Sequence, residues 1–258
     1  TSTGIGIKKG DTLILSEASL MIGYEPNQVS DRVVTNPNAA HFDAEFRGVS
    51  IDTLSNPRFL QDKSFIKQTY SIFADTTFHA TYNTNQIGVQ IEQITTGRNH
   101  KNHDKYVLFE YRITNLSGAT LDSLNVGLYA DWDIGDKKNK ANWNQNKKFA
   151  YVFDDNGIYS GIKVFDEVLN YFAIDLDGSI GGTNLNLSDG FSDSEKHQSL
   201  SSRMARIEAG YTGIGNDVAH VVGTTIFNIP NGAVDTVTFA MMVGNNIEDL
   251  EQTIKSVF

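Results

Sequence analysis

The sequence predicts an all-β protein, a β-sandwich of two mainly antiparallel sheets with a short helix and a C-terminal helix. Three features predict this fold. Apolar and polar residues alternate with a period of two along many short segments, which is typical of half-buried strands. Glycine contributes 22 of the 258 residues, and it suits the tight turns that join short strands. Strand-like segments recur every 8–12 residues or so, which favours a sandwich or barrel over alternating strands and helices.

Strands are expected along most of the chain. The run from Lys105 to Ile113 is rich in β-branched and aromatic residues, and a turn-forming cluster at 115–118 ends it. The segment 124–132 follows, and we expect these two strands to pair as antiparallel neighbours. The Asp-Asn-Gly triplet at 155–157 predicts a hairpin with a type I′ turn. Further strands are expected at about 18–23, 45–51, 66–74, 87–95, 148–154, 157–164, 170–176, 203–210, 218–228 and 234–243.

Two helices and one long loop complete the predicted order. Ser192 and Glu195 have the spacing of a capping box, so a short helix is expected over 193–201. A C-terminal helix is expected over 246–258, capped by Asn245 or Asn246, because four apolar residues fall on one helical face: Ile247, Leu250, Ile254 and Val257. The polar stretch 136–148 is expected to be a surface loop.

Composition and charge exclude several classes of protein. The chain has no cysteine, which excludes disulfide scaffolds, Cys-ligated zinc, iron–sulfur clusters and a cysteine nucleophile. The formal net charge of −10 argues against a nucleic-acid partner. No apolar run is long enough for a membrane-spanning helix. Thr1 opens the sequence without an initiator Met, so we expect one domain over 1–258 that is a fragment or processed part of a larger protein.

An acidic turn is the sharpest local feature. Asp131 and Asp133 are two residues apart, so on a strand they project from the same face, and Asp136 follows a glycine that lets the chain turn back. Carboxylates gathered at the end of a strand are ligands that calcium prefers. We therefore predict a calcium site at these three residues. In the alternative interpretation the same acids cap turns by accepting backbone N–H bonds. Asp175 and Asp177, and also Asn216 with Asp217, are candidates for a second part of the site.

Aromatic and histidine side chains offer further candidates. Trp143 lies between two asparagines in the polar stretch, and exposed aromatic rings beside polar side chains are a common means of binding sugars. Trp143 is therefore a candidate ligand-binding residue, with a place in the core as the alternative. His100 and His103 share a polar loop with several basic residues, and we expect a solvated loop there rather than a zinc site.

Motifs for catalysis are not found in the sequence. It contains neither a GxSxG elbow nor an HExxH segment, so no catalytic residue is assigned and a non-catalytic role is expected. Paired carboxylates for glycoside hydrolysis stay open as an alternative, because their separation is a property of the folded chain.

Several ordered blocks resemble one known group of proteins. Together they resemble the region that follows the catalytic domain in secreted subtilisin-like peptidases of the Bacteroidota, which are cargo of type IX secretion. The blocks are 106–115 (YVLFEYRITN), 127–135 (GLYADWDIG), 170–175 (NYFAID), 189–192 (DGFS) and 213–223 (GIGNDVAHVVG). The Asp, His and Ser blocks of the peptidase domain are absent from the chain, so the resemblance does not carry over proteolytic activity.

The resemblance implies an extracellular, non-catalytic accessory or binding domain, secreted or at the cell surface and covalently linked to a peptidase domain in the full-length protein. A polysaccharide or another protein is the expected ligand. Two alternatives from other classes remain. One is a carbohydrate-binding or carbohydrate-active domain. The other is a structural subunit of an extracellular assembly, in which an unpaired edge strand accepts a strand from a partner.

Overall fold

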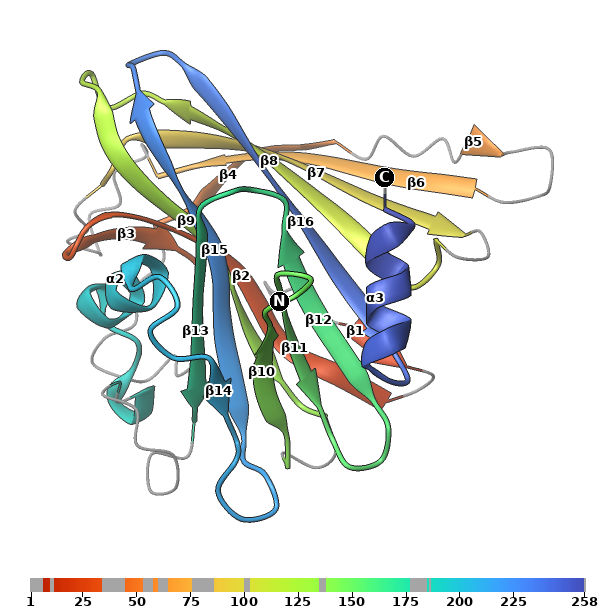
Figure 1. Cartoon of the computed structure of the whole chain (residues 1–258). Helices are drawn as coiled ribbons and strands as arrows, with labels where there is room; N and C mark the ends of the chain where they lie inside the picture. Colours follow the sequence, from red (N-terminus) through yellow and green to blue (C-terminus); the bar gives the residue numbers. More distant parts are fainter. Residues whose placement is uncertain are drawn as a thin grey trace.

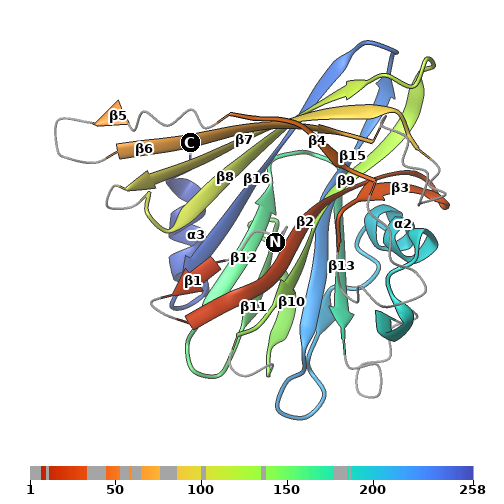
Figure 2. The same ribbon diagram turned by 180° about the vertical axis from the view of Figure 1, so that it is seen from behind.

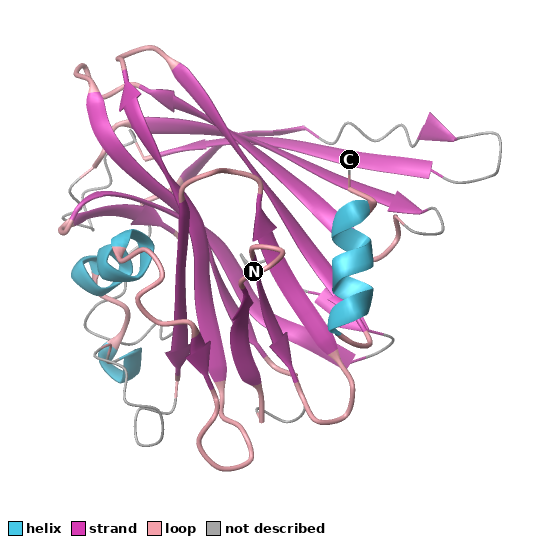
Figure 3. Cartoon of the chain, viewed as in Figure 1, coloured by secondary structure: helices cyan, strands magenta, loops and turns pink. Residues whose placement is uncertain are grey.

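The chain folds into two antiparallel β-sheets, as the sequence predicts (Figure 1). The computed structural model describes residues 7–9, 12–33, 45–52, 58–59, 65–75, 86–99, 103–134, 138–176, 185 and 187–257. Strands dominate these residues, and the helices are short (Figure 3). None of the described helices is both long and apolar enough to cross a membrane.

The first sheet has six strands and is built from both ends of the chain. Its central strand is β9 (Leu121–Trp132), which pairs on one side with β2 (Thr12–Glu25) and on the other with β15 (Val218–Ile229). The remaining strands of this sheet are β1 (Ile7–Lys9), β3 (Gln28–Asp31) and β13 (Leu169–Asp175).

The second sheet has ten strands, and β16 (Val234–Gly244) lies near its middle, between β12 (Tyr159–Val164) and β8 (Tyr106–Asn115). Beyond β12 follow three strands: β11 (Phe149–Phe153), β10 (Lys140–Asn144) and β14 (Glu208–Ala209). Beyond β8 follow β7 (Val89–Asn99), β6 (Phe65–Ala74) and β4 (Arg47–Asp52), with β5 (Arg58–Phe59) also paired to β6.

Three apolar clusters form the core. The largest lies between the two sheets and includes Trp132, Phe239 and Tyr111. The helix α2 (Asp193–Ser201) covers the opposite face of the six-stranded sheet, and α3 (Ile247–Lys255) packs against β16 and β12 of the ten-stranded sheet (Figure 2). A 3₁₀ turn, η2 (Leu187–Asp189), precedes α2. Both predicted helices are confirmed, including the Ser192–Glu195 capping box and the Asn246 cap.

Small residues let α2 approach its sheet closely. Gly127 lies directly beneath the helix residue Leu200, and a Cβ at this position would stand 2.7 Å from Leu200 Cδ2. Gly23, on the neighbouring strand, leaves space for the same leucine side chain. Because these positions carry no side chain, Leu200 fills the space above the sheet and is itself buried.

Backbone hydrogen bonds connect the two sheets at their sides. On one side the segment 203–206 covers the outer edge of β13, because Tyr171 N donates to Arg203 O over 2.8 Å and Ala173 N donates to Arg206 O over 2.9 Å. On the other side Ser30 Oγ donates to Asp75 Oδ2 over 2.7 Å, and Phe46 N donates to Asp31 O over 3.3 Å.

The pairing predicted between 105–113 and 124–132 is wrong. These segments form β8 and β9, which belong to different sheets. The residues between them cross from one sheet to the other instead of closing a hairpin. Asn115 holds this crossover, because its buried side-chain amide donates to Ala119 O over 2.7 Å and to Ile229 O over 2.8 Å. A turn cluster in the sequence marks a change of direction and does not reveal whether the next strand returns to the same sheet.

Three finer predictions also need correction. A hairpin does join β11 to β12, but its turn is not type I′, because Gly157 has a positive φ of 83° and Asn156 is not among the positive-φ residues. The predicted loop at 136–148 contains β10. The predicted strand at 203–210 is reduced to β14, because most of that segment covers the edge of β13 as an irregular chain.

Candidate functional site

Four aromatic side chains gather on the outer face of the ten-stranded sheet. Tyr151, Phe153 and Tyr159 project from β11 and β12 on the face that also carries α3, and each is partly exposed, with Tyr151 and Tyr159 packed against the apolar cluster under that helix. Tyr211 follows β14 and is 46% exposed. Its hydroxyl accepts a hydrogen bond of 2.7 Å from Asn142 Nδ2, and Asn142 pairs directly with Tyr151 across the strands. We call these four residues the aromatic platform.

Three rings of the platform are nearly parallel. Phe153 and Tyr159 are paired across neighbouring strands, with centroids 5.1 Å apart and planes at 10°. Tyr151 lies 5.8 Å from Phe153 and 6.5 Å from Tyr159 by the same measure. Gly161 faces Tyr151 in the register, and the space above this glycine is occupied by Leu250 of α3, since a Cβ there would stand 3.4 Å from Leu250 Cδ1. The result is a row of rings at the surface of a rigid sheet.

The hydroxyl groups of Tyr151 and Tyr159 keep their protons. Burial raises the pKa of Tyr151 above its usual value, and it raises the pKa of Tyr159 with a further contribution from the carboxylates of Glu248, Asp154 and Asp155. Both phenols therefore remain hydrogen-bond donors at neutral pH. The amide of Asn142 adds a neutral polar group beside them.

The predicted ligand residue Trp143 is not part of this surface. It lies in β10 with its ring toward the core and is only 8% exposed. Its ring centroid stands 5.3 Å from that of Tyr171, and Tyr171 in turn contacts His220 at 5.7 Å. The expectation of a polar loop at this position is therefore wrong. Asn142 and Asn144 face outward while Trp143 faces inward, which is the alternation of a strand.

Of the predicted calcium ligands, Asp131 lies on the outer face of the six-stranded sheet, and Asp133 follows just after the end of β9. Asp131 is the second-last residue of β9 and pairs across the strands with Glu17 of β2 and with Ala219 of β15. Because facing residues of an antiparallel pair share a face, Glu17 and Asp131 project together, and Asp217 joins them from two residues before Ala219. We call Glu17, Asp131, Asp133 and Asp217 the acidic row.

The buried hydroxyl of Tyr129 points among these carboxylates. Tyr129 is fully buried, and its hydroxyl has no hydrogen-bond partner among the residues that the structure describes. Burial raises the pKa of Tyr129 well above its usual value, with further contributions from Asp131, Glu17 and Asp217. The predicted ligand Asp136 lies outside the described residues. Within the described ranges, no group of three or more His, Asp or Glu side chains has a geometry that would enclose a metal ion.

The other acidic pairs have different surroundings. Asp175 holds a turn, as the alternative interpretation predicts, because its carboxylate pairs with Arg206 and accepts Gly210 N at 2.8 Å and Asn216 Nδ2 at 2.9 Å. Asp177 lies outside the described residues. Asp217 belongs to the acidic row. Glu17 was missed by sequence reasoning, although an acid within the apolar run of β2 was a usable signal.

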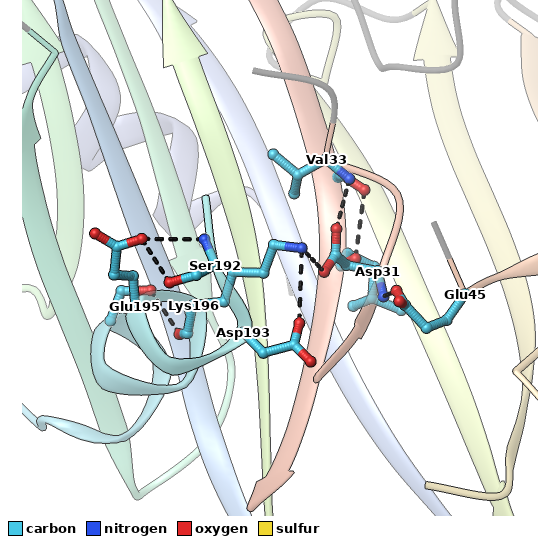
Figure 4. Close-up of polar contacts among 10 residues, drawn as sticks. Asp31, Val33, Glu45, Ser192, Asp193, Glu195 and Lys196 are labelled. Carbon is cyan, nitrogen blue, oxygen red and sulfur yellow. Dashed lines mark hydrogen bonds and ion pairs between the residues drawn. The ribbon is translucent and has the colours of Figure 1, made fainter. Parts of the chain in front are cut away.

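A buried ion pair fastens α2 to the six-stranded sheet (Figure 4). Lys196 Nζ stands 2.8 Å from Asp31 Oδ2, and the two side chains are 2% and 0% exposed. Asp31 Oδ1 also accepts Val33 N at 2.6 Å, while Asp31 N donates to Glu45 Oε2 at 3.1 Å. Since this cluster is enclosed by protein, its lysine is not accessible to a ligand, and it acts on stability.

Histidine side chains occupy ordered positions within the described residues. Trp132 Nε1 donates to His220 Nε2 over 3.0 Å, so the proton of His220 is on Nδ1, and burial lowers the pKa of His220 to about 3. Ser201 Oγ lies 3.4 Å from His197 Nδ1 but donates to the His197 carbonyl over 2.7 Å, so its hydroxyl is committed to the helix. His103 Nδ1 is 2.8 Å from Tyr106 Oη, whereas His100 is outside the described residues.

Comparisons with known proteins give remote structural similarity. No family model matches the chain, and no curated protein sequence matches it. A heparan sulfate lyase, HepC from Pedobacter heparinus, is 10% identical with a TM-score of 0.39 over 81% of this chain. The match covers 23% of the lyase, so this chain spans about a quarter of that enzyme. A putative aldose 1-epimerase from Escherichia coli K12 is 8% identical with a TM-score of 0.38, over 79% of this chain and 85% of that one.

Proposed function

We propose that this chain is a non-catalytic carbohydrate-binding domain of a secreted protein, with the aromatic platform as its binding surface. One observation carries the proposal, the gathering of one exposed and three partly exposed aromatic rings on the outer face of a sheet, with three of the rings nearly parallel. The C–H faces of sugar rings pack favourably on such rings, and adjoining hydroxyl and amide groups bind sugar hydroxyls.

The accessory role and the location outside the cell rest on the sequence blocks that resemble secreted subtilisin-like peptidases. Under this proposal the platform would hold a covalently linked peptidase domain at a glycan-rich surface. Such a role requires binding of a ligand without catalysis, and side chains held on the face of a sheet are suited to it.

The alternative functions find less support. Strand addition at the outer edge of β13 is disfavoured, because Tyr171 N and Ala173 N already bond to the segment 203–206. A glycoside-cleaving pair is not assigned to the acidic row, since Glu17 and Asp131 face the buried Tyr129 hydroxyl on a sheet surface.

Calcium at the acidic row is a second part of the proposal. Like charges that face each other across strands destabilise a sheet, and a divalent cation with oxygen ligands relieves this repulsion. The buried Tyr129 hydroxyl supports a ligand here, because an unpaired hydroxyl in the interior is costly. The calcium site stays a prediction for Asp131, Asp133 and Asp136, since no group of three or more described carboxylates has the geometry of a metal site.

Co-sedimentation with insoluble polysaccharides tests the main proposal. The purified chain is incubated with cellulose, chitin and insoluble xylan, and the bound fraction is measured. We expect binding to at least one of them, lost in the double variant Tyr159→Ala/Tyr211→Ala. Phe227→Ala is the matched control, because Phe227 is a similarly exposed aromatic residue on β15 of the other sheet. Binding that is equal in the double variant would place the ligand elsewhere.

A further inference from the structure

The charges around the aromatic platform restrict its ligand. Tyr159 lies within the electrostatic reach of three carboxylates, those of Glu248, Asp154 and Asp155. Among the described residues, Lys140 stands 5.9 Å from the centroid of the Phe153 ring. Its amino group is paired with Asp155 Oδ1 at 3.0 Å, so these two charges offset each other and the carboxylates of Glu248 and Asp154 remain. The exposed end of the platform therefore carries a negative potential.

Other basic residues of the hairpin are directed away from the rings. Lys147 and Lys148 lie in the turn between β10 and β11, at the end of the hairpin opposite Phe153, about 13 Å along the strand. Lys163 donates to the carbonyl oxygens of both residues at 2.9 Å, which fixes its amino group at that same end. Among the residues that the structure describes, an anionic ligand on the rings would therefore meet carboxylates without a free cation beside it.

From this arrangement we infer that the platform binds a neutral, linear polysaccharide and rejects sulfated or uronate-bearing chains. The inference rests on the proposed carbohydrate-binding function and names the ligand class of the same site. The three parallel rings form a row that follows β11 and crosses to β12, and a chain of sugar rings lies along it. The carboxylates near Tyr159 can accept hydrogen bonds from sugar hydroxyls, and a neutral sugar carries several of these donors.

Affinity electrophoresis with soluble glycans tests this inference. The probes are three neutral chains (barley β-glucan, xyloglucan and galactomannan) and three anionic ones (alginate, polygalacturonate and heparin). We expect retardation by at least one neutral glycan and by none of the anionic glycans. The Kd for the neutral glycan should rise roughly tenfold or more in Tyr159→Ala and in Tyr211→Ala, and stay unchanged in Phe227→Ala. It should also change little between about 0.01 and 1 M salt, because the contact involves no charge pairing.

Each contrary result identifies what is wrong. Retardation by an anionic glycan that is lost in Tyr159→Ala and Tyr211→Ala would overturn the inference about charge and leave the carbohydrate-binding function intact. Neutral binding that survives both substitutions would overturn the assignment of the ligand to the platform. Failure of all six glycans and of the insoluble polysaccharides would overturn the inference together with the proposed function.

Discussion

Substituting Lys196 should destabilise the protein far more than substituting a lysine or arginine in an exposed ion pair. Lys196→Met keeps the length and packing of the side chain and removes its charge, which leaves Asp31 buried without its cation at 2.8 Å. Removing one partner of a buried pair costs about 3–5 kcal/mol. For a chain of this size the melting temperature should fall by roughly 6–20 °C, from about 2–4 °C per kcal/mol.

The pair between Arg112 and Glu110 is a matched control. Its N–O separation is also 2.8 Å, but the two side chains are 46% and 36% exposed. Because an exposed pair contributes about 0–1 kcal/mol, Arg112→Met should change stability little. The double variant Lys196→Met/Asp31→Asn should recover part of the loss, since it removes the uncompensated charge. Urea unfolding followed by circular dichroism measures all four proteins. Equal losses in Lys196→Met and Arg112→Met would refute the role given to burial.

Three further predictions follow from the packing, the acidic row and the buried histidine. Gly127→Ala should cost about 1–3 kcal/mol in urea unfolding, because the new Cβ would stand 2.7 Å from Leu200 Cδ2, and unchanged stability would show that α2 can shift. Millimolar calcium should raise the melting temperature above its value in excess chelator, and Asp131→Asn should abolish the difference; equal temperatures in both buffers argue against the ion. Burial lowers the pKa of His220 to about 3, so below pH 6.5 or so the unfolded chain binds a proton that the folded chain does not. The free energy of unfolding should therefore decrease by up to about 1.4 kcal/mol for each pH unit below that value. His220→Gln should reduce that acid-side slope in urea unfolding between pH 7 and 5, and a slope equal to that of the wild type would exclude His220 as its source.

Local sequence signals predicted the individual elements well and their partners poorly. The capping box at Ser192 and the apolar face of the C-terminal helix act within a few residues, and both helices are confirmed. The partners of β8 and β9 depend on which sheet each strand joins: β9 pairs with residues of β15 that lie 86–108 positions later, and β8 pairs with residues of β16 that lie 120–136 positions later. Asn115 lies at this crossover, and its two carbonyl partners are 4 and 114 residues distant.

The candidate site was predictable only in part for the same reason. Asp131 was predicted as a site residue, but Glu17 reaches it through strand pairing that no local pattern reveals. Trp143 was misplaced because its asparagine neighbours suggested a loop, whereas they are the outward half of a strand. The aromatic platform combines residues of β11 and β12 with Tyr211, some 50–60 residues later in the chain, so only the folded sheet reveals it.

The order of strands also sets when the fold can be completed. The six-stranded sheet is divided until β15 enters between β9 and β13, and the ten-stranded sheet is divided until β16 enters between β12 and β8. Both strands lie after residue 217, near the C-terminal end. The described strands that precede residue 218 therefore form only separate parts of each sheet, and folding depends on pairing between distant segments, which is slow. Addition of β15 and β16 is therefore the late step of folding, because each of these strands joins the two separate parts of its own sheet.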